Sequence, residues 1–293
     1  MRLTKLEKNK KLDFTDRSAI ITGGSGMLGR VYASAIAECG AEVYIFDKKI
    51  HEKKTRDLIK KEYKLDAEKI SKIHFIECDI TKLTDVQKKI KQIRKKIENL
   101  KILINNASLV KQVGNEDLKE AYKPFMKMNP SDWEDYLKVD ITGALLMNQN
   151  CIPIMQKNGG GSIINISSTY GILSPDQRIY EVFNKKLPLD YKNDGFYIEK
   201  PIGYSISKSA VLNMTRFLAT KFAKDGIRVN TLTLGGVYDN NPKEFVKEYS
   251  KRTPLNRMAN RTEYVGPILF LASEMSSYMT GSNLIVDGGW SAW

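Results

Sequence analysis

The stretch SAIITGGSGMLG, residues 18–29, places a short apolar run directly before a cluster of glycines. Residues 18–22 predict a buried strand, and apolar side chains at helical spacing from Leu28 to Cys39 predict a helix. Glycines let a backbone approach an anion closely, and the free N–H groups of a helix N-terminus attract phosphate. Because glycines also form ordinary tight turns, the neighbouring residues have to decide between the two interpretations.

The residues that follow favour a phosphate site. Residues 41–46 predict a second strand, which ends at Asp47, eighteen positions after Gly29. A carboxylate roughly 20 residues beyond the glycines is expected to bind an adenosine ribose. The order of strand, turn, helix, strand and acid therefore predicts a dinucleotide site. Asp47 predicts NAD rather than NADP because a carboxylate repels a 2′-phosphate.

Strands and helices alternate along the 293 residues of the chain. The predicted strands are residues 18–22, 42–46, 73–77, 102–105, 162–167, 227–232 and 283–286, and the predicted helices are 28–39, 52–63, 84–98, 132–155, 204–224, 242–250 and 262–273. This alternation predicts an α/β fold with a doubly wound parallel sheet. We expect one domain over residues 18–293, with a basic lead-in at 1–17, a loop at 111–129 and an irregular insertion at 174–202.

The composition of the chain narrows its class and its partners. The net charge of +13 accompanies amphipathic helices such as 84–98, whose lysines fill the solvated face, and no nucleic-acid motif is present. We therefore expect attraction of anionic small molecules rather than binding of nucleic acid. No apolar run reaches membrane-spanning length and no signal-peptide core opens the chain, so we expect a cytoplasmic protein without a membrane partner.

Metal-ligand residues are scarce in this sequence. Cys39, Cys78 and Cys151 form no CxxC pair, and the chain has only two histidines. Cys39 and Cys78 fall on apolar faces, which indicates reduced core thiols. We expect no metal site.

The second half of the chain carries a candidate acid–base group. Tyr204 and Lys208 are four positions apart, so both side chains lie on one face of a predicted helix. A phenol is a weak base at neutral pH, and a neighbouring ammonium group favours its phenolate form. Such a pair is common on protein surfaces, but this one follows a dinucleotide turn and the strand-end Ser167-Ser168. The combination predicts the proton transfer that hydride transfer at a hydroxyl or ketone requires.

Together these motifs resemble the short-chain dehydrogenase/reductase family over nearly the whole chain, and the resemblance implies a Rossmann fold with NAD as cofactor. The matching motifs are TGGSGMLG at 22–29, Asp47, CDI at 78–80, NNAS at 105–108, INISSTYG at 164–171, Tyr204-x-x-x-Lys208, GIRVN at 226–230 and YMTGSNLIVDGG at 278–289. Residues 160–289 are most similar to the branch named flagellin modification protein A, which is tied to bacterial surface-sugar synthesis and flagellin glycosylation. The cues are INISSTYGILSPD and GGVYDNNPKEF.

The resemblance also implies residue roles. Tyr204 would be the acid/base, Lys208 would favour its phenolate and hold the nicotinamide ribose, and Ser168 would hydrogen-bond the substrate oxygen. Ser167 would take that role if the alignment is shifted by one residue. The implied cofactor contacts are Gly23, Ser25, Met27, Leu28, Gly29, Asp47, Asp79, Ile80, Asn106, Ala107, Tyr204, Lys208 and Val237. For Asn105-Asn106, a purely structural role at the strand end is the alternative.

Four features depart from the family pattern. The family's active-site asparagine falls at Asp140, which stays a candidate catalytic residue because a carboxylate can also hold a relay water. Leu234-Gly235 stands in place of Pro-Gly. The glycine spacing TGxxGxxG is typical of the family's extended, nucleotide-sugar branch. Finally, Ser168 and Tyr204 are 36 positions apart, farther than in ordinary members.

The long segment between Ser168 and Tyr204 is a candidate substrate loop. Residues 174–202 must begin and end beside the reacting carbon, and long ordered loops commonly bind ligands. Four of its basic residues are candidate contacts for an anion, and five aromatic residues are candidates for stacking on a base or sugar: Arg178, Lys185, Lys186 and Lys192, and Tyr180, Phe183, Tyr191, Phe196 and Tyr197. A surface or subunit-contact insertion without a ligand is the alternative.

These observations predict an NAD-dependent oxidoreductase that interconverts a hydroxyl and a ketone on an activated or acidic sugar. One alternative is a 3-oxoacyl thioester or small-alcohol reductase of the same fold. The alternative of another class is a non-catalytic dinucleotide-sensing protein, which the Asp140 and Leu234 departures would favour. The resemblance further implies a homodimer or homotetramer, and Trp290 and Trp293 are large aromatic residues that a monomer would struggle to cover.

Overall fold

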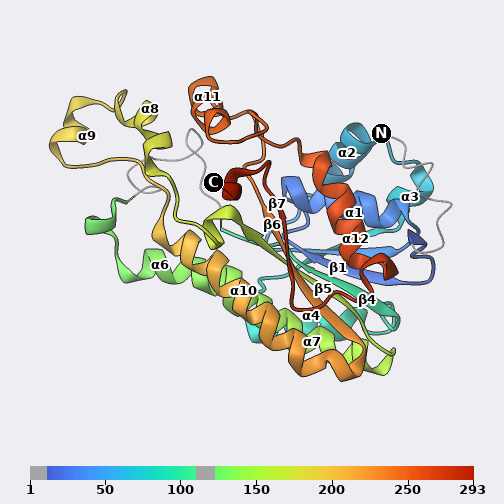
Figure 1. Cartoon of the computed structure of the whole chain (residues 1–293). Helices are drawn as coiled ribbons and strands as arrows, with labels where there is room; N and C mark the ends of the chain where they lie inside the picture. Colours follow the sequence, from blue (N-terminus) through green and yellow to red (C-terminus); the bar gives the residue numbers. More distant parts are fainter. Residues whose placement is uncertain (1–11, 110–122) are drawn as a thin grey trace.

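A sheet of seven parallel strands forms the centre of the protein (Figure 1). The computed structural model describes residues 12–109 and 123–293. The strands are β1 (Ser18–Thr22), β2 (Glu42–Asp47), β3 (Ile73–Glu77), β4 (Leu100–Asn105), β5 (Gly161–Ser168), β6 (Ile227–Leu234) and β7 (Asn283–Val286), in the spatial order β3-β2-β1-β4-β5-β6-β7. The chain winds outward from β1 in both directions, and such sheets bind ligands at the carboxyl ends of the strands, where the order reverses. The predicted doubly wound α/β fold is confirmed.

Helices cover both faces of this sheet. Helices α1 (Met27–Glu38) and α12 (Val265–Ala272) pack on one face, and α4 (Leu83–Ile93), α7 (Ala144–Lys157) and α10 (Ile202–Phe222) pack on the other (Figure 1). The neighbouring residues Ile20 and Ile21 in β1 join different apolar clusters, one on each face. Continuous apolar strands are expected when both faces of a sheet are buried, because successive side chains point to opposite faces.

The predicted helix over residues 132–155 is in fact three segments. Helix α6 (Pro130–Leu137) leads into a π-helical turn, η3 (Lys138–Gly143), and α7 continues from Ala144. The wider turn places Asp140 in the buried interior of the protein. Apolar spacing does not distinguish a π turn from an α turn, so the sequence pattern could not show it. The pattern also missed the short helix α3 (Ala67–Ser71), whereas α2 (Glu52–Tyr63) has the predicted bounds.

The described part of the basic lead-in belongs to the core. Leu12 and Phe14 are buried among the side chains of α1, and the Phe14 N–H donates to the Cys39 carbonyl at 2.8 Å. The side chains of Leu12 and Phe14 therefore pack with the apolar cluster that also contains α1. Residues 1–11 of the lead-in and residues 110–122, which include most of the predicted 111–129 loop, lie outside the described residues.

The insertion at 174–202 folds into short helical segments that lie beside helix α11 (Lys243–Lys251) (Figure 1). The segments are η5 (Gln177–Tyr180), α8 (Glu181–Asn184) and α9 (Leu189–Asn193). Their apolar side chains join Tyr249 of α11 and Trp290 in a third cluster. The expectation that Trp290 is uncovered in a monomer is wrong, because its ring stacks on Tyr249 at 4.3 Å between centroids and is 7% exposed. Trp293 is 78% exposed.

The cysteines and the longer helices also bear on predictions made from the sequence. All three cysteines are free and buried, which agrees with the core positions predicted for Cys39 and Cys78. Within residues 12–109 and 123–293, no helix combines the length and apolar character that crossing a membrane requires.

Candidate active site

One cavity of about 670 Å³ opens at the carboxyl ends of the strands. Its walls include all the predicted cofactor contacts except Ser25, and they include Ser168 and Ser167. Further lining residues come from the insertion and from the segments after β6: Tyr180, Phe183, Lys200, Phe245, Tyr249 and Met258. The structure thus joins the glycine turn, the Tyr204–Lys208 pair and the insertion in a single cavity.

The glycine turn is packed too tightly for side chains. A Cβ on Gly29 would lie 2.5 Å from the Gly24 Cα and would also collide with the Gly23 carbonyl. Gly23 has a φ of +61°, and a Cβ there would lie 2.8 Å from the Ala107 Cα. The turn therefore presents bare backbone and the N-terminus of α1 to the cavity, which is the environment a diphosphate needs.

Asn106, the residue that follows β4, holds this turn in place by hydrogen bonds. Its side-chain amide donates to the carbonyls of Thr22 and Gly23 at 3.0 and 3.1 Å. Asn105 is buried instead and donates to the side chains of Asn148 and Asn165. The asparagine pair thus has the structural role that was the alternative to ligand contact, although Asn106 also lines the cavity.

Asp47 lies at the end of β2 with its carboxylate oriented by backbone groups. It accepts hydrogen bonds from the N–H groups of Ser25 at 3.0 Å and Lys48 at 2.8 Å. Burial raises the pKa of the Asp47 carboxyl, and the backbone hydrogen bonds oppose that shift. Ser25 contributes to the site through this contact, because its N–H holds the Asp47 carboxylate, which lines the cavity.

The two candidate serines have different partners. The Ser167 hydroxyl donates to the Lys208 carbonyl at 2.8 Å, so it ties β5 to α10. The Ser168 oxygen accepts only a long hydrogen bond, 3.3 Å, from the Tyr170 N–H among the described residues. This leaves the Ser168 proton available to a substrate oxygen, and the geometry favours Ser168 over Ser167 for that role.

Lys208 is buried beneath Tyr204 and is held from two sides. Its Nζ donates to the Ile166 carbonyl at 3.1 Å and lies 3.4 Å from the Asp140 Oδ2. The same Nζ lies 5.8 Å from the centre of the Tyr204 ring. The structure thus fixes the ammonium group near the Tyr204 ring, as the four-residue spacing of the pair predicts.

Asp140 does not line the main cavity but lies behind Lys208. Its Oδ2 accepts hydrogen bonds from the hydroxyls of Ser207 at 2.7 Å and Ser108 at 3.1 Å, and its Oδ1 accepts from the Leu109 N–H at 3.3 Å. The side chain is fully buried. Every described polar neighbour of Asp140 is a donor, so the buried carboxylate is well satisfied.

The predicted anion contacts of the insertion do not reach the cavity. Arg178 pairs with Asp176 at 2.8 Å and its side chain is 75% exposed, while Lys186 pairs with Glu244 at 2.6 Å. Lys185 is also exposed, and the Lys192 Nζ donates to the Lys185 carbonyl. The prediction that these residues contact an anion in the cavity is wrong. Carboxylates of the insertion and of α11 hold Arg178, Lys185 and Lys186 at the surface, and a backbone carbonyl holds Lys192 there.

Among the predicted aromatic contacts, Tyr180 and Phe183 line the cavity. Phe196 packs edge-on against Tyr191 instead, and Tyr197 is 39% exposed. The basic residue of the insertion that does line the cavity is Lys200. Lys200 was not among the residues predicted to contact an anion. Its signal was its position four residues before Tyr204, the same interval that separates Tyr204 from Lys208.

Comparisons with known proteins agree with this geometry. Residues 17–180 match the family model described as short chain dehydrogenase, and residues 190–291 match the model described as enoyl-(acyl carrier protein) reductase. D-arabinitol 2-dehydrogenase (ribulose-forming) of Scheffersomyces stipitis is 31% identical and covers 97% of this chain and 96% of its own. A probable galactose dehydrogenase of Rhizobium meliloti is 28% identical, with 94% and 96% covered.

A solved structure has the same fold. The short chain dehydrogenase from Leptospira borgpetersenii with bound NAD+ matches with a TM-score of 0.78 and 28% identity, over 97% of this chain and 96% of that one.

Proposed function

This chain belongs to the short-chain dehydrogenase/reductase family, and we propose that it is an NAD-dependent oxidoreductase that interconverts a hydroxyl and a ketone on an activated or acidic sugar. One observation carries the proposal: Ser168, Tyr204 and Lys208 lie on the wall of the cavity that also contains the glycine turn. This arrangement places an acid–base group for the substrate and a diphosphate site for a cofactor in one cavity.

The cavity fits a nicotinamide dinucleotide. The bare turn at Gly23 and Gly29 would hold its diphosphate, Asp47 its adenosine ribose, and Lys208 its other ribose. When bound, the nicotinamide accepts or supplies the hydride. In the oxidising direction the substrate hydroxyl gives its proton to the Tyr204 oxygen while its carbon loses the hydride, and reduction reverses both transfers.

The remaining polar residues orient and stabilise that proton transfer. The Ser168 hydroxyl would donate to the substrate oxygen, and the Lys208 ammonium stabilises a negative charge on Tyr204. Ser167 and Asp140 act indirectly, because Ser167 binds the Lys208 carbonyl and Asp140 pairs with the Lys208 Nζ. Asp140 is therefore a positioning residue in this proposal rather than a group that contacts the substrate.

The sugar assignment is supported by the relatives and by the shape of the site. Two of the similar proteins are named for galactose and for the sugar alcohol arabinitol. Tyr180 and Phe183 add aromatic surface to the cavity, and sugars pack well on aromatic rings. A role in bacterial surface-glycan synthesis rests on the similarity of residues 160–289 to the flagellin modification branch.

A 3-oxoacyl thioester reductase is the second candidate, because the family model that matches residues 190–291 is described as an acyl carrier protein reductase. The choice between sugar and thioester depends on the substrate half of the cavity. A non-catalytic dinucleotide sensor is disfavoured by the placement of Tyr204 and Lys208.

The experiment that tests the proposal is an NADH-formation assay on free, acidic, phosphorylated and nucleotide-linked sugars, with an acetoacetyl thioester assayed for NADH consumption. Tyr204→Phe should lower kcat at least about 100-fold and leave NADH affinity unchanged, because only the proton donor is removed. Tyr278→Phe is the matched control, since Tyr278 is fully exposed. Turnover of the thioester alone, or full activity of Tyr204→Phe, would refute the proposal.

A further inference from the structure

We propose that Lys200 determines the substrate specificity of this site, and that its ammonium group binds an anionic group of the substrate, a carboxylate or a phosphate, beside Tyr204. This inference rests on the proposed function and names the chemical class of the sugar. Its residue lies in the insertion and is distinct from Ser168, Tyr204 and Lys208.

The position of Lys200 follows from the end of the insertion. Pro201 precedes the first turn of α10 and brings the insertion back to the cavity, so Lys200 lies one turn before Tyr204. The Lys200 Nζ lies 3.7 Å from the centre of the Tyr204 ring. An ammonium group over an aromatic face is held by the ring's quadrupole, which keeps this cation at the reacting end of the cavity.

The charges around Lys200 do not cancel. The Asp140 carboxylate is 3.4 Å from the Lys208 Nζ, and both side chains are buried. Within the described residues, no carboxylate lies within ion-pair distance of the Lys200 Nζ. Asp239 also lines the cavity. The charged groups that change the pKa of Lys200, however, are Lys208 and Asp140. Asp140 thus pairs with Lys208 and acts on Lys200 only from beyond ion-pair distance, so one positive charge remains at the cavity wall.

Burial, followed by repulsion from Lys208, lowers the pKa of Lys200 to about 8, while Asp140 opposes the shift. The amine is therefore mostly protonated at neutral pH, in surroundings that disfavour its charge. A ligand anion would remove that penalty by pairing with the ammonium group, and charge-assisted hydrogen bonds of this kind are strong. The cavity is accordingly suited to an anionic substrate and disfavours a neutral one.

The other cations near the cavity are already paired. Lys48 lines the nucleotide end and lies 3.6 Å from Asp79, and Lys186 is bound to Glu244 outside the cavity. Lys208 is engaged by Asp140 and by a backbone carbonyl. Lys200 is thus the cation at the substrate end that the described protein groups leave for a ligand.

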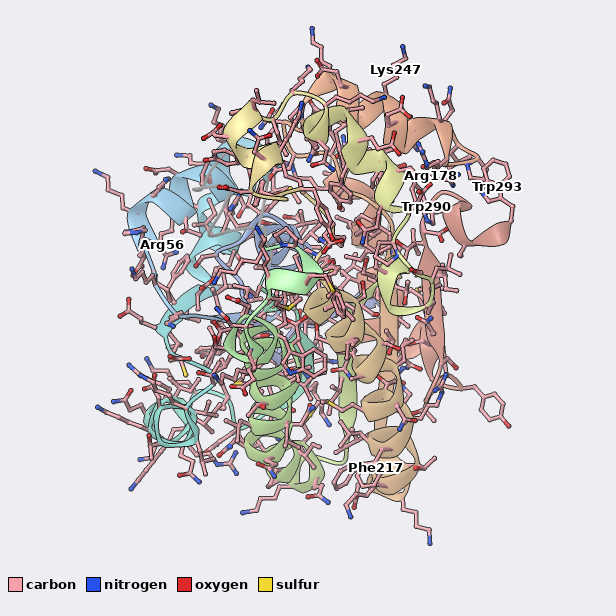
Figure 2. The ribbon with its side chains drawn as sticks, turned by 90° about the vertical axis from the view of Figure 1, so that its left-hand side faces the viewer. Arg56, Arg178, Phe217, Lys247, Trp290 and Trp293 are labelled. Carbon is pink, nitrogen blue, oxygen red and sulfur yellow. The ribbon has the colours of Figure 1, made fainter. Side chains whose placement is uncertain are left out.

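The test compares binding of matched sugars to the NADH-loaded protein by titration calorimetry at pH 7. D-galacturonate and D-galactose 6-phosphate each carry an anion that D-galactose lacks. We expect the wild type to bind at least one anionic sugar at least about tenfold more tightly than galactose, and Lys200→Met to lose that preference. Lys200→Arg should keep it. Lys247→Met is the matched control, because Lys247 is an exposed lysine of α11 (Figure 2).

The two anions separate the possible sources of the charge, since a preference for only galacturonate assigns a carboxylate and a preference for only the 6-phosphate assigns a phosphate. No preference in the wild type, or a preference that survives in Lys200→Met, would overturn the inference. Lys200→Gln is a second neutral variant if Lys200→Met does not fold. Binding is read without turnover, so Lys200-dependent anion binding without sugar oxidation would refute the proposed function alone.

Discussion

Asp140 and Lys208 form a buried ion pair, with the Asp140 Oδ2 3.4 Å from the Lys208 Nζ. The π turn η3 supplies the carboxylate and α10 supplies the ammonium group, so the pair joins two helical segments beneath Tyr204. The carboxylate holds Lys208 in place but also cancels part of its charge. Asp140 therefore positions the Lys208 ammonium group beneath Tyr204. Lys200 is a second positively charged residue beside the same ring.

Substitutions of Asp140 should show how much its carboxylate contributes to stability and to the position of Lys208. Asp140→Leu leaves Lys208 buried without a partner and should lower the free energy of unfolding by about 3–5 kcal/mol in a urea titration. Asp140→Asn keeps the side-chain shape and should destabilise the protein less. Asp140→Asn should also lower kcat, because Lys208 loses the ion pair that holds it beneath Tyr204. Glu134→Gln is the surface control, since Glu134 is half-exposed. Unchanged stability in Asp140→Leu together with unchanged kcat in Asp140→Asn would contradict the assigned role of Asp140.

We expect Asp47 to make the protein prefer NAD(H) to NADP(H) at least about tenfold, or about 1.4 kcal/mol, because its carboxylate repels a 2′-phosphate. Asp47→Asn should weaken NADH binding and narrow the preference. Fluorescence titration with both cofactors measures this. Asp57→Asn, on the exposed side of α2, serves as the control. Equal or tighter NADPH binding by the wild type would show that Lys48 and Lys49 outweigh Asp47.

We expect a glycine-to-alanine substitution to be harmful at Gly29 and stabilising at Gly266, because the space around the two residues differs. Gly29→Ala places a Cβ against the Gly23 carbonyl and should abolish measurable NADH binding, because the turn cannot close around a diphosphate. Gly266→Ala on α12 meets no atom within 4 Å and should raise the free energy of unfolding by up to about 1 kcal/mol. Near-normal NADH affinity in Gly29→Ala would place the diphosphate elsewhere.

The affinity for an anionic sugar should fall as the pH rises. With a pKa of about 8, the Lys200 amine loses its proton above that pH, so the dissociation constant for D-galacturonate should rise about tenfold per pH unit. Lys200→Arg stays charged and should give a nearly flat profile up to pH 10. Calorimetry across pH 6.5–10 measures the dissociation constant for both proteins, after NADH binding has been measured at each pH. A flat wild-type profile would mean that another cation holds the anion.

We expect the protein to self-associate through α7 and α10, the helices that the family resemblance implies for subunit contact. Phe217 on α10 is 61% exposed and is labelled in Figure 2. Leu145 on α7 is 42% exposed, so both helices carry unburied apolar surface. Light scattering should give a dimer or tetramer mass at micromolar concentration, and Phe217→Glu should shift it toward the monomer. Phe125→Glu, outside both helices, is the control. A wild-type monomer would rule this out.

The cofactor half of the site was predictable because it is local in sequence. A strand, a glycine turn and a helix occupy residues 18–38, and Asp47 follows at the end of the next strand. Helical spacing likewise places Tyr204 and Lys208 on one face of α10. In each case one or two adjacent elements set the geometry, so the order and spacing of the residues were sufficient.

Tertiary structure alone decided which charges face the substrate. Asp176 and Arg252 are bonded at 2.5 Å although they are 76 positions apart, and Lys186 reaches Glu244 across the same interface. The Lys186–Glu244 pair holds Lys186 at the surface, and Asp176 holds Arg178 there as well. Lys200 instead lies over Tyr204, and a π turn that apolar spacing does not reveal carries Asp140 to Lys208. The sequence by itself determined the elements and their local chemistry, whereas pairing between distant segments determined which cation remains in the cavity, because a charge is oriented by its nearest partner in space.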